Sequence, residues 1–371
     1  MNLFGRKSAG RASARPALVR PTGGSAAWGE WPRTYEAQVR AAYLGNAVAQ
    51  RCVRLVAEGA ASIRLVASVP EAAALIAATS AGQRLIETVA MHLLLHGNAY
   101  VQLVRDARDR PAELYALRPE RVSIEAGPDG WPAAFVYRAG ERAVRLPVTD
   151  GAGRPLLVHV RTAHPTDDHY GLGCLGAASG AVAVHNAATR WSKALMDNAA
   201  RPSGALVYEP GEPGATLSAE QYARLKTEME ENFQGAANAG RPMLLEGGLR
   251  WQAMSLSPAD MDFLGLKAAA AREIALAFGV PPLLIGLPGD NSYANYSEAN
   301  RALWRQTILP LGEKMLAALC EGLRGWWPDL MLGMDRDAVP ALAEERAALW
   351  AQVGAADFLS DDEKRAMLGI R

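Results

Sequence analysis

The sequence predicts an α+β fold, and three observations lead to that prediction. Segments with the alternating pattern of strands follow helical segments between residues 43 and 160. A small insert with strands and one helix, residues 205–256, lies between two other helices. Two further helical segments flank a polar loop between residues 258 and 322. Helices and strands therefore gather in separate parts of the chain, as in α+β proteins.

The composition is that of a globular protein made in a reducing compartment. Of the 371 residues, 50% are hydrophobic and 21% charged, and the formal net charge is zero, which argues against a generally basic nucleic-acid binder. The length allows two or three modules with cores of their own. Cys52, Cys174 and Cys320 are far apart and form no CxxC, so we interpret them as buried thiols. The sequence contains neither the apolar core of a signal peptide nor an uncharged apolar run of membrane-spanning length. We expect a protein that stays in the cytoplasm or assembles from it.

The first part of the chain, residues 1–30, is predicted to be a disordered basic arm. It combines low hydrophobicity with like charges among Gly, Ser, Ala and Pro. Its charged residues are Arg6, Lys7, Arg11, Arg15 and Arg20, against Glu30. Two interpretations stay open: an arm that touches nucleic acid or an acidic neighbour, and a solvated tail.

Residues 43–170 are predicted to form a mixed module. Apolar residues recur at helical spacing from Tyr43, a strand is expected at 63–66, and a second helix at 75–96 ends at Gly97. Alternating residues predict the strands that follow. These are 99–104, 114–117, 122–124, 134–137 and 156–160.

The next part is predicted to be a helix, an insert and a returning helix. An Ala- and Gly-rich helix runs to about Asn198. The insert has strands at 205–208, 243–246 and 250–254, and a polar helix that Ser218 caps with Gln221 at the third position.

The returning helix begins the segment on which we place most weight. Ser257 and Pro258 suit its start, and Gly279 ends it near Phe278. Pro281 and Pro282 have no amide hydrogen to donate and push the preceding residue out of the helical region, so the chain must turn there.

A polar loop at 286–296 and a second helix follow this turn. The loop has no apolar periodicity and is rich in Gly, Asn, Ser and Tyr. Asn295 and Glu298 form a capping-box signature for the second helix, and Pro310 predicts a kink in it, since the apolar pattern continues beyond the proline.

The C-terminal part, 329–371, carries nine acidic and five basic residues. A helix is expected at 338–353. Ser360 and Glu363 predict a capping box for a last short helix that ends at Gly369.

Three motifs raise the possibility of an enzyme or a metal site. Gly171, Gly173 and Gly176 match GxGxxG with Asp197 further on, but no βαβ unit surrounds them, so we prefer a glycine-rich start of a tightly packed helix. His92 and His96 have zinc-ligand spacing without a third ligand, and Asp167 to His169 is more typical of a turn than of a cation site. Neither a P-loop nor a GxSxG elbow occurs in the sequence.

Several strings resemble the portal proteins of tailed phages, in the family found in long-tailed phages, prophages and gene-transfer particles. The matching residues are Arg272–Ala275 (REIA), Phe278–Pro282 (FGVPP), Leu284–Gly286, Tyr293, Asn295, Glu298 and Leu309–Pro310. HGNAYV from His96, LYALRPERVSIE from Leu114 and LVHV from Leu157 resemble the body of the same family. The resemblance covers most of the chain beyond the arm.

The resemblance implies a portal fold. Its parts would be the arm (1–30), an α+β wing (31–170), a first stem helix region (171–200), a clip (201–257), a second stem helix (258–279), a turn and tunnel loop (280–296), a long kinked wing helix (297–328) and a helical crown (329–371).

The implied function is that of a ring, a dodecamer in this family, at one capsid vertex of a virion or phage-like particle. Double-stranded DNA would pass through it, the major capsid protein would surround it, and the large terminase and then a head-to-tail adaptor would dock on the clip. The resemblance implies no enzyme activity, metal, cofactor or membrane.

The residues assigned to this role are those of the loop and the helix break. The tunnel loop facing DNA would present Asp290, Asn291, Ser292, Tyr293, Asn295 and Tyr296, and the break would be formed by Gly279, Pro281 and Pro282. Residues 286–296 contain no Lys or Arg, which suits a channel that must not hold phosphate strongly. The alternatives are a surface loop without DNA contact, a scaffold or adaptor that binds only proteins, and a nucleotide-cofactor enzyme using Gly171, Gly173 and Gly176.

Overall fold

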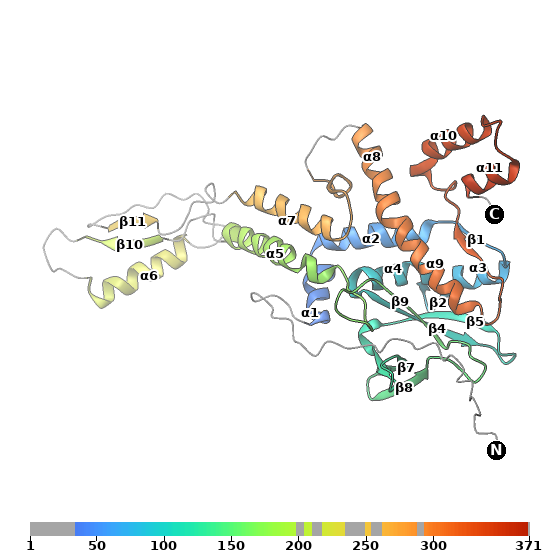
Figure 1. The fold of residues 1–371 in the computed structure, drawn as a ribbon. Coiled ribbons are helices and arrows are strands. Elements are labelled where there is room, and N and C mark those ends of the chain that lie inside the picture. The colour runs from blue at the N-terminus through green and yellow to red at the C-terminus, as the bar shows by residue number, and fades with distance from the viewer. Residues whose placement is uncertain are drawn as a thin grey trace, which may run out of the picture. The chain divides into compact units, whose positions relative to one another are not determined.

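The computed structural model describes residues 34–197, 204–209, 217–233, 249–253, 262–287 and 293–369. It confirms a mixed α/β fold (Figure 1). The described residues form two compact units. The larger comprises those up to Ala178 and from Ala275 onward, and the smaller runs from Ser179 to Ile274.

The larger unit is built on two three-stranded antiparallel sheets. The first has the order β5-β4-β9, with β4 (Asn98–Arg105) between β5 (Pro111–Leu117) and β9 (Leu157–Arg161). The second has the order β6-β7-β8. Its strands are β6 (Val122–Ala126), β7 (Pro132–Ala139) and β8 (Arg142–Pro147). Side chains of both sheets form one apolar core. It contains Tyr100, Leu117, Val122, Phe135, Leu146 and Leu157.

Helices cover the first sheet. α4 (Leu85–His96) contacts β4, α9 (Leu309–Leu323) contacts β9, and α2 (Ala47–Ser62) contacts α4. α9 can lie close to β9 because Gly322 has no side chain, and a methyl group there would come within 2.2 Å of Val158 Cγ2. Both faces of β4 are thus covered, which explains why Asn98, Ala99, Tyr100 and Val101 are all buried.

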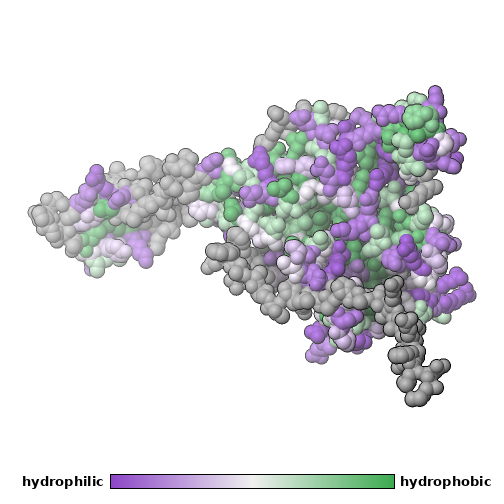
Figure 2. Space-filling view, viewed as in Figure 1, coloured by the Kyte–Doolittle hydropathy of each residue, from purple (hydrophilic) through white to green (hydrophobic). Residues whose placement is uncertain are grey.

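The remaining elements of this unit are short or peripheral. α1 (Tyr35–Val39) precedes α2, and β1 (Leu65–Ala67) pairs antiparallel with β12 (Leu332–Met334). The last two helices, α10 (Ala343–Gly354) and α11 (Asp361–Leu368), form a C-terminal pair, and the Ser360–Glu363 capping box and the end at Gly369 are confirmed. Figure 2 shows hydrophobic residues gathered over this pair, where Trp350, Phe358 and Met367 are exposed.

The predicted helix at 75–96 is wrong, because two helices stand in its place. α3 (Pro70–Ala77) is followed by the hairpin of β2 (Thr79–Ser80) and β3 (Gln83–Arg84), and only then by α4. Ala81 and Gly82 turn the chain with φ of +46° and +78°. Ser80 Oγ donates to Glu113 of β5, so a contact distant in sequence fixes a turn that the apolar periodicity conceals.

The smaller unit holds the insert between parts of two helices. α5 (Leu175–Asp197) leads into it and α7 (Phe263–Ala277) leads out of it. β10 (Gly204–Tyr208) pairs antiparallel with β11 (Leu249–Ala253), and α6 (Ala219–Phe233) lies between them in sequence. The predicted cap of α6 is confirmed, because Gln221 N donates to Ser218 Oγ (3.2 Å) and Ser218 N to Gln221 Oε1 (2.9 Å). The strand expected at 243–246 and the helix start at Ser257 and Pro258 lie outside the described residues.

Within the described ranges, no helix is both long and apolar enough to cross a membrane.

Candidate functional site

The end of α7 forms the base of the candidate site. Gly279, two residues after the helix, has a φ of +65°, and its N–H donates to Leu276 O (3.0 Å), while Val280 N donates to Ala275 O (2.9 Å). Pro281 and Pro282 follow, and one turn of 3₁₀ helix over Pro282–Ile285 ends at Gly286. The structure thus places Gly279, Pro281 and Pro282 where the chain leaves α7.

A threonine of the next helical segment holds this break in place. Thr307 Oγ1 donates to Gly279 O at 2.6 Å, and a methyl group on Gly279 would lie 2.8 Å from the same Oγ1. Glycine is therefore required twice, for its positive φ and for this close approach. The sequence pattern did not reveal Thr307, because the two residues are 28 positions apart.

A π-helical turn interrupts the long second helix just before Pro310, the residue at which a kink is predicted. α8 (Tyr293–Leu303) passes through a π-helical turn, Trp304–Ile308, into α9. Proline has no amide hydrogen and its ring collides with the carbonyl four residues earlier, so a wider turn before Pro310 relieves the clash. Leu303, just before the turn, and Ile308, its last residue, are almost fully buried, in line with an apolar pattern that continues through it.

The loop residues are only partly described. Asp290, Asn291 and Ser292 lie outside the described residues. Tyr293, Asn295 and Tyr296 belong to the first turn of α8, where the side chains of Asn295 and Tyr296 are exposed.

The predicted capping box of Asn295 and Glu298 is wrong, because α8 already begins at Tyr293. Glu298 instead forms ion pairs with Arg301 (2.9 Å) and Arg305 (3.8 Å) on its own helix. Arg301, one turn further along, and Arg305, two turns further along, thus both attract the Glu298 carboxylate.

Arginines of this helical segment also contact α10. Arg301 pairs with Glu344 (3.0 Å) and Glu345 (3.6 Å), and Arg305 pairs with Glu345 (2.9 Å). The Arg301 side chain is only 19% exposed. Glu344 and Glu345 lie in the first turn of α10, where the helix dipole favours negative charge. The sequence pattern did not reveal this cluster. The signal that could have revealed it is the pair of adjacent glutamates at the start of a helix.

The glycines of the GxGxxG stretch allow its backbone to cross close to the backbone of residues 95–97. A methyl group on Gly171 would lie 2.1 Å from Gly97 O, and one on Gly173 would lie 2.5 Å from Leu95 O. Asn98 holds the crossing together, since its Oδ1 accepts from Gly171 N (2.7 Å) and its Nδ2 donates to Gly171 O (3.2 Å). The backbone of residues 95–97 thus occupies the space in which a pyrophosphate would approach Gly171 and Gly173. The structure matches the interpretation as a glycine-rich start of a tightly packed helix.

The histidines singled out in the sequence belong to the core. Burial lowers the pKa of His92 and of His96 to about 4, so both are neutral at pH 7. Asp167 Oδ1 accepts from the N–H of His169 (2.8 Å) and of Tyr170 (2.9 Å), which makes Asp167 to His169 a turn. In the part of the chain that the structure describes, no group of three His, Cys, Asp or Glu side chains is arranged to hold a metal ion.

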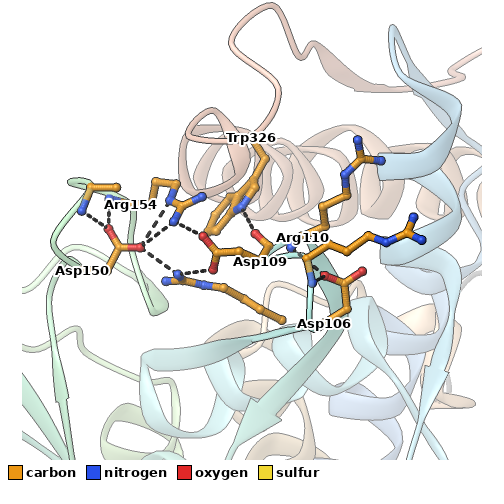
Figure 3. A network of polar contacts seen from close by, with 9 residues as sticks. Asp106, Asp109, Arg110, Asp150, Arg154 and Trp326 are labelled. Carbon is orange, nitrogen blue, oxygen red and sulfur yellow. Dashed lines mark hydrogen bonds and ion pairs between the residues drawn. The ribbon is translucent and has the colours of Figure 1, made fainter.

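A second charged cluster lies at the other end of α9 (Figure 3). Arg105 pairs with Asp109 (2.9 Å) and Asp150 (2.7 Å), and Arg154 pairs with the same two carboxylates. Both guanidinium groups lie 5.1 Å from the ring of Trp326, whose Nε1 donates to Asp109 O. The hydrogen bond from the backbone of Arg154 and the bonds from the two guanidinium groups lower the pKa of Asp150 to about 2. With its charges mutually paired, this cluster fastens the turns at 106–110 and 150–154 to Trp326, just after α9.

The sequence and the fold are similar to those of known proteins. The family model for phage portal proteins matches residues 47–369. A chain from the virion of a native gene transfer agent particle is 49% identical, with a TM-score of 0.70 over 93% of this chain and 95% of that one. A chain from the neck of the native particle, computed with C12 symmetry, is also 49% identical, with a TM-score of 0.70 over 92% of this chain and 95% of that one.

More distantly related proteins are also similar to this chain. A probable portal protein of Streptomyces phage phiC31 is 28% identical over 68% of this chain and 51% of its own length. An uncharacterised protein of Rickettsia bellii is 37% identical over 89% of this chain and 88% of its own. An HK97-family phage portal protein from Corynebacterium diphtheriae shares the fold at 18% identity, with a TM-score of 0.60 over 84% of this chain and 100% of that one.

Proposed function

The chain belongs to the phage portal protein family, and on that premise we propose that it forms a twelve-membered ring at one capsid vertex, through which double-stranded DNA enters and leaves. The observation that carries this proposal is the 49% identity, over 92% of the chain, to a protein in a particle neck with C12 symmetry. A ring of identical copies around a hole serves as a channel by its shape.

The tunnel loop is the part that we assign to DNA. It extends from the break at Gly279 and Pro281 to the first turn of α8, and residues 286–296 contain Asp290 but no Lys or Arg. Each phosphate that a cation neutralises adds salt-dependent affinity, which would slow DNA of any sequence in a channel. Amide and hydroxyl groups such as those of Asn291 and Ser292 make weak, exchangeable contacts instead.

The other parts take the roles implied by the family. Residues 201–257 would be the clip on which the packaging motor and later the head-to-tail adaptor dock, and residues 171–200 and 258–279 the stem. The wing would face the major capsid protein. In this scheme the chain itself makes and breaks no bond.

Crosslinking from the start of α8 tests the assignment of the loop. A photo-crosslinking side chain replaces Tyr296, which is 52% exposed, and a matched one replaces Val144 of β8, which is 50% exposed. We expect DNA crosslinks from position 296 in packaging particles and none from position 144. Equal yields at both positions, or none at 296 in particles that contain DNA, would leave a ring or scaffold whose loop does not meet DNA.

A further inference from the structure

The two arginines that follow the tunnel loop are the first cations after it, and neither is free. From Gly286 to Thr307 the chain contains Arg301 and Arg305 as its only Lys or Arg residues. Both lie next to the segment that we assign to DNA, where an unpaired guanidinium would bind phosphate in bidentate fashion. Something must neutralise them if the channel is to stay non-adhesive.

Three carboxylates surround these two guanidinium groups. Glu298 of α8 reaches both arginines, Glu344 reaches Arg301, and Glu345 reaches both, at 2.9 to 3.8 Å. The cluster has one more negative than positive charge. Figure 2 shows hydrophilic residues gathered over α8, in agreement with an ionic surface there.

The C-terminal pair supplies two of the three carboxylates, and its remaining contact with this segment is small. Val339 and Leu342, just before α10, are buried, but within α10 only Val353 is. Glu344 is 85% exposed and Arg305 47% exposed. An ion pair whose partner is in contact with water contributes about 0–1 kcal/mol to stability, so these pairs are a weak means of fastening a helix. They are an effective means of cancelling charge, because Glu344 and Glu345 stand where the α10 dipole favours them.

We propose that α10 is an anionic cover, in which Glu344 and Glu345 mask Arg301 and Arg305 from the phosphates of DNA in the channel. This inference rests on the proposed function, because a cover against phosphate matters only where DNA passes. A phosphate that approaches the covered segment meets a net negative cluster instead of two free guanidinium groups. DNA therefore moves past without being held.

Glutamine substitution separates masking from fastening. The double variant Glu344→Gln, Glu345→Gln keeps side-chain length and hydrogen-bonding groups but removes two negative charges per copy. We expect purified rings of this variant to bind a short DNA duplex about tenfold more tightly at low salt. The slope of log K against log salt should steepen by about 0.9 for each phosphate newly contacted.

Three further variants complete the experiment. Glu344→Asp, Glu345→Asp should keep the affinity of the parent protein, and adding Arg301→Gln and Arg305→Gln to the glutamine variant should restore it. Glu313→Gln, Glu321→Gln removes two carboxylates that pair with other arginines, Arg336 and Arg324, and should raise the affinity less.

The outcomes distinguish the inference from the proposed function. Intact rings of the Glu344→Gln, Glu345→Gln variant with unchanged DNA affinity, together with faster hydrogen exchange in α10, would show that the pairs only fasten the helix. A gain equal to that of the Glu313→Gln, Glu321→Gln control would overturn the cover as well. Failure of position 296 to crosslink would overturn the assignment of the loop without bearing on these affinities.

Discussion

The crossing at Gly97 and the surface around α8 are held together in opposite ways. At the crossing, two backbone segments touch with no side chain between them, and buried Asn98 satisfies their polar groups. Around α8, charged side chains meet across helices, and pairs with an exposed member, such as Arg301 with Glu344, contribute little to stability. The tight crossing favours a single conformation of the body, whereas we propose that the surface around α8 avoids binding DNA strongly. Substitutions in the first region should therefore affect stability, and those in the second should affect DNA.

The largest expected effect is that of Gly171→Ala. Its methyl group would lie 2.1 Å from Gly97 O, an approach that only movement of the backbone can relieve, so we expect a loss of about 3 kcal/mol or more in the free energy of unfolding. The measurement is thermal unfolding together with soluble yield. Gly176→Ala is the control, since a methyl group there would meet no neighbouring heavy atom within 4 Å and alanine suits a helix better than glycine. Equal behaviour of the two variants would contradict the tight crossing.

Acid should destabilise the same region. Burial lowers the pKa of His92 and His96 to about 4 and that of His159, beside Asn98, to about 3. The unfolded chain, with histidine pKa values near 6.5, binds more protons throughout this window, so stability falls as the pH drops from about 6.5 to 4.

We expect a loss of roughly 3 kcal/mol or more between pH 7 and pH 4, measured by denaturant unfolding. A stability that is flat over this range would show that the buried histidines do not titrate as the core requires.

Asn98→Leu should cost somewhat less, about 2–3 kcal/mol. Leucine is similar in size to asparagine but cannot form hydrogen bonds. The substitution therefore leaves Gly171 N, Gly171 O and His159 Nε2 without the bonds that Asn98 makes to them. The midpoint of denaturant unfolding measures the loss. An unchanged midpoint would mean that packing alone maintains the crossing.

The smallest effect on stability is expected at the base of the loop. Thr307→Val keeps the shape of the side chain but removes the hydrogen bond to Gly279 O, at a cost of about 1 kcal/mol. Thr307→Ser keeps the donor and should be milder. The measurement is hydrogen exchange of residues 278–286, which should quicken in the valine variant. Identical exchange in the two variants would show that the hydrogen bond from Thr307 to Gly279 O does not stabilise the helix break.

Local chemistry explains what the sequence predicted correctly. Gly279, Pro281 and Pro282 determine a helix break by their own backbone limits, and Ser218 and Ser360 cap helices that begin at the next residue. Contacts between residues that are far apart in the sequence could not be predicted, because they depend on the tertiary fold. Arg301 and Glu344 are 43 positions apart, and β8 was missed because most of its residues are exposed and charged or small.

The central claim is that the tunnel loop acts on DNA while the body only holds it in place. DNA content per particle tests this most directly, in particles assembled with a chain that lacks Asp290–Ala294 and with the parent chain. We predict that the deletion leaves closed rings with a central hole, visible by negative-stain imaging, while the particles contain less DNA. Intact rings with an unchanged amount of DNA per particle would contradict the claim.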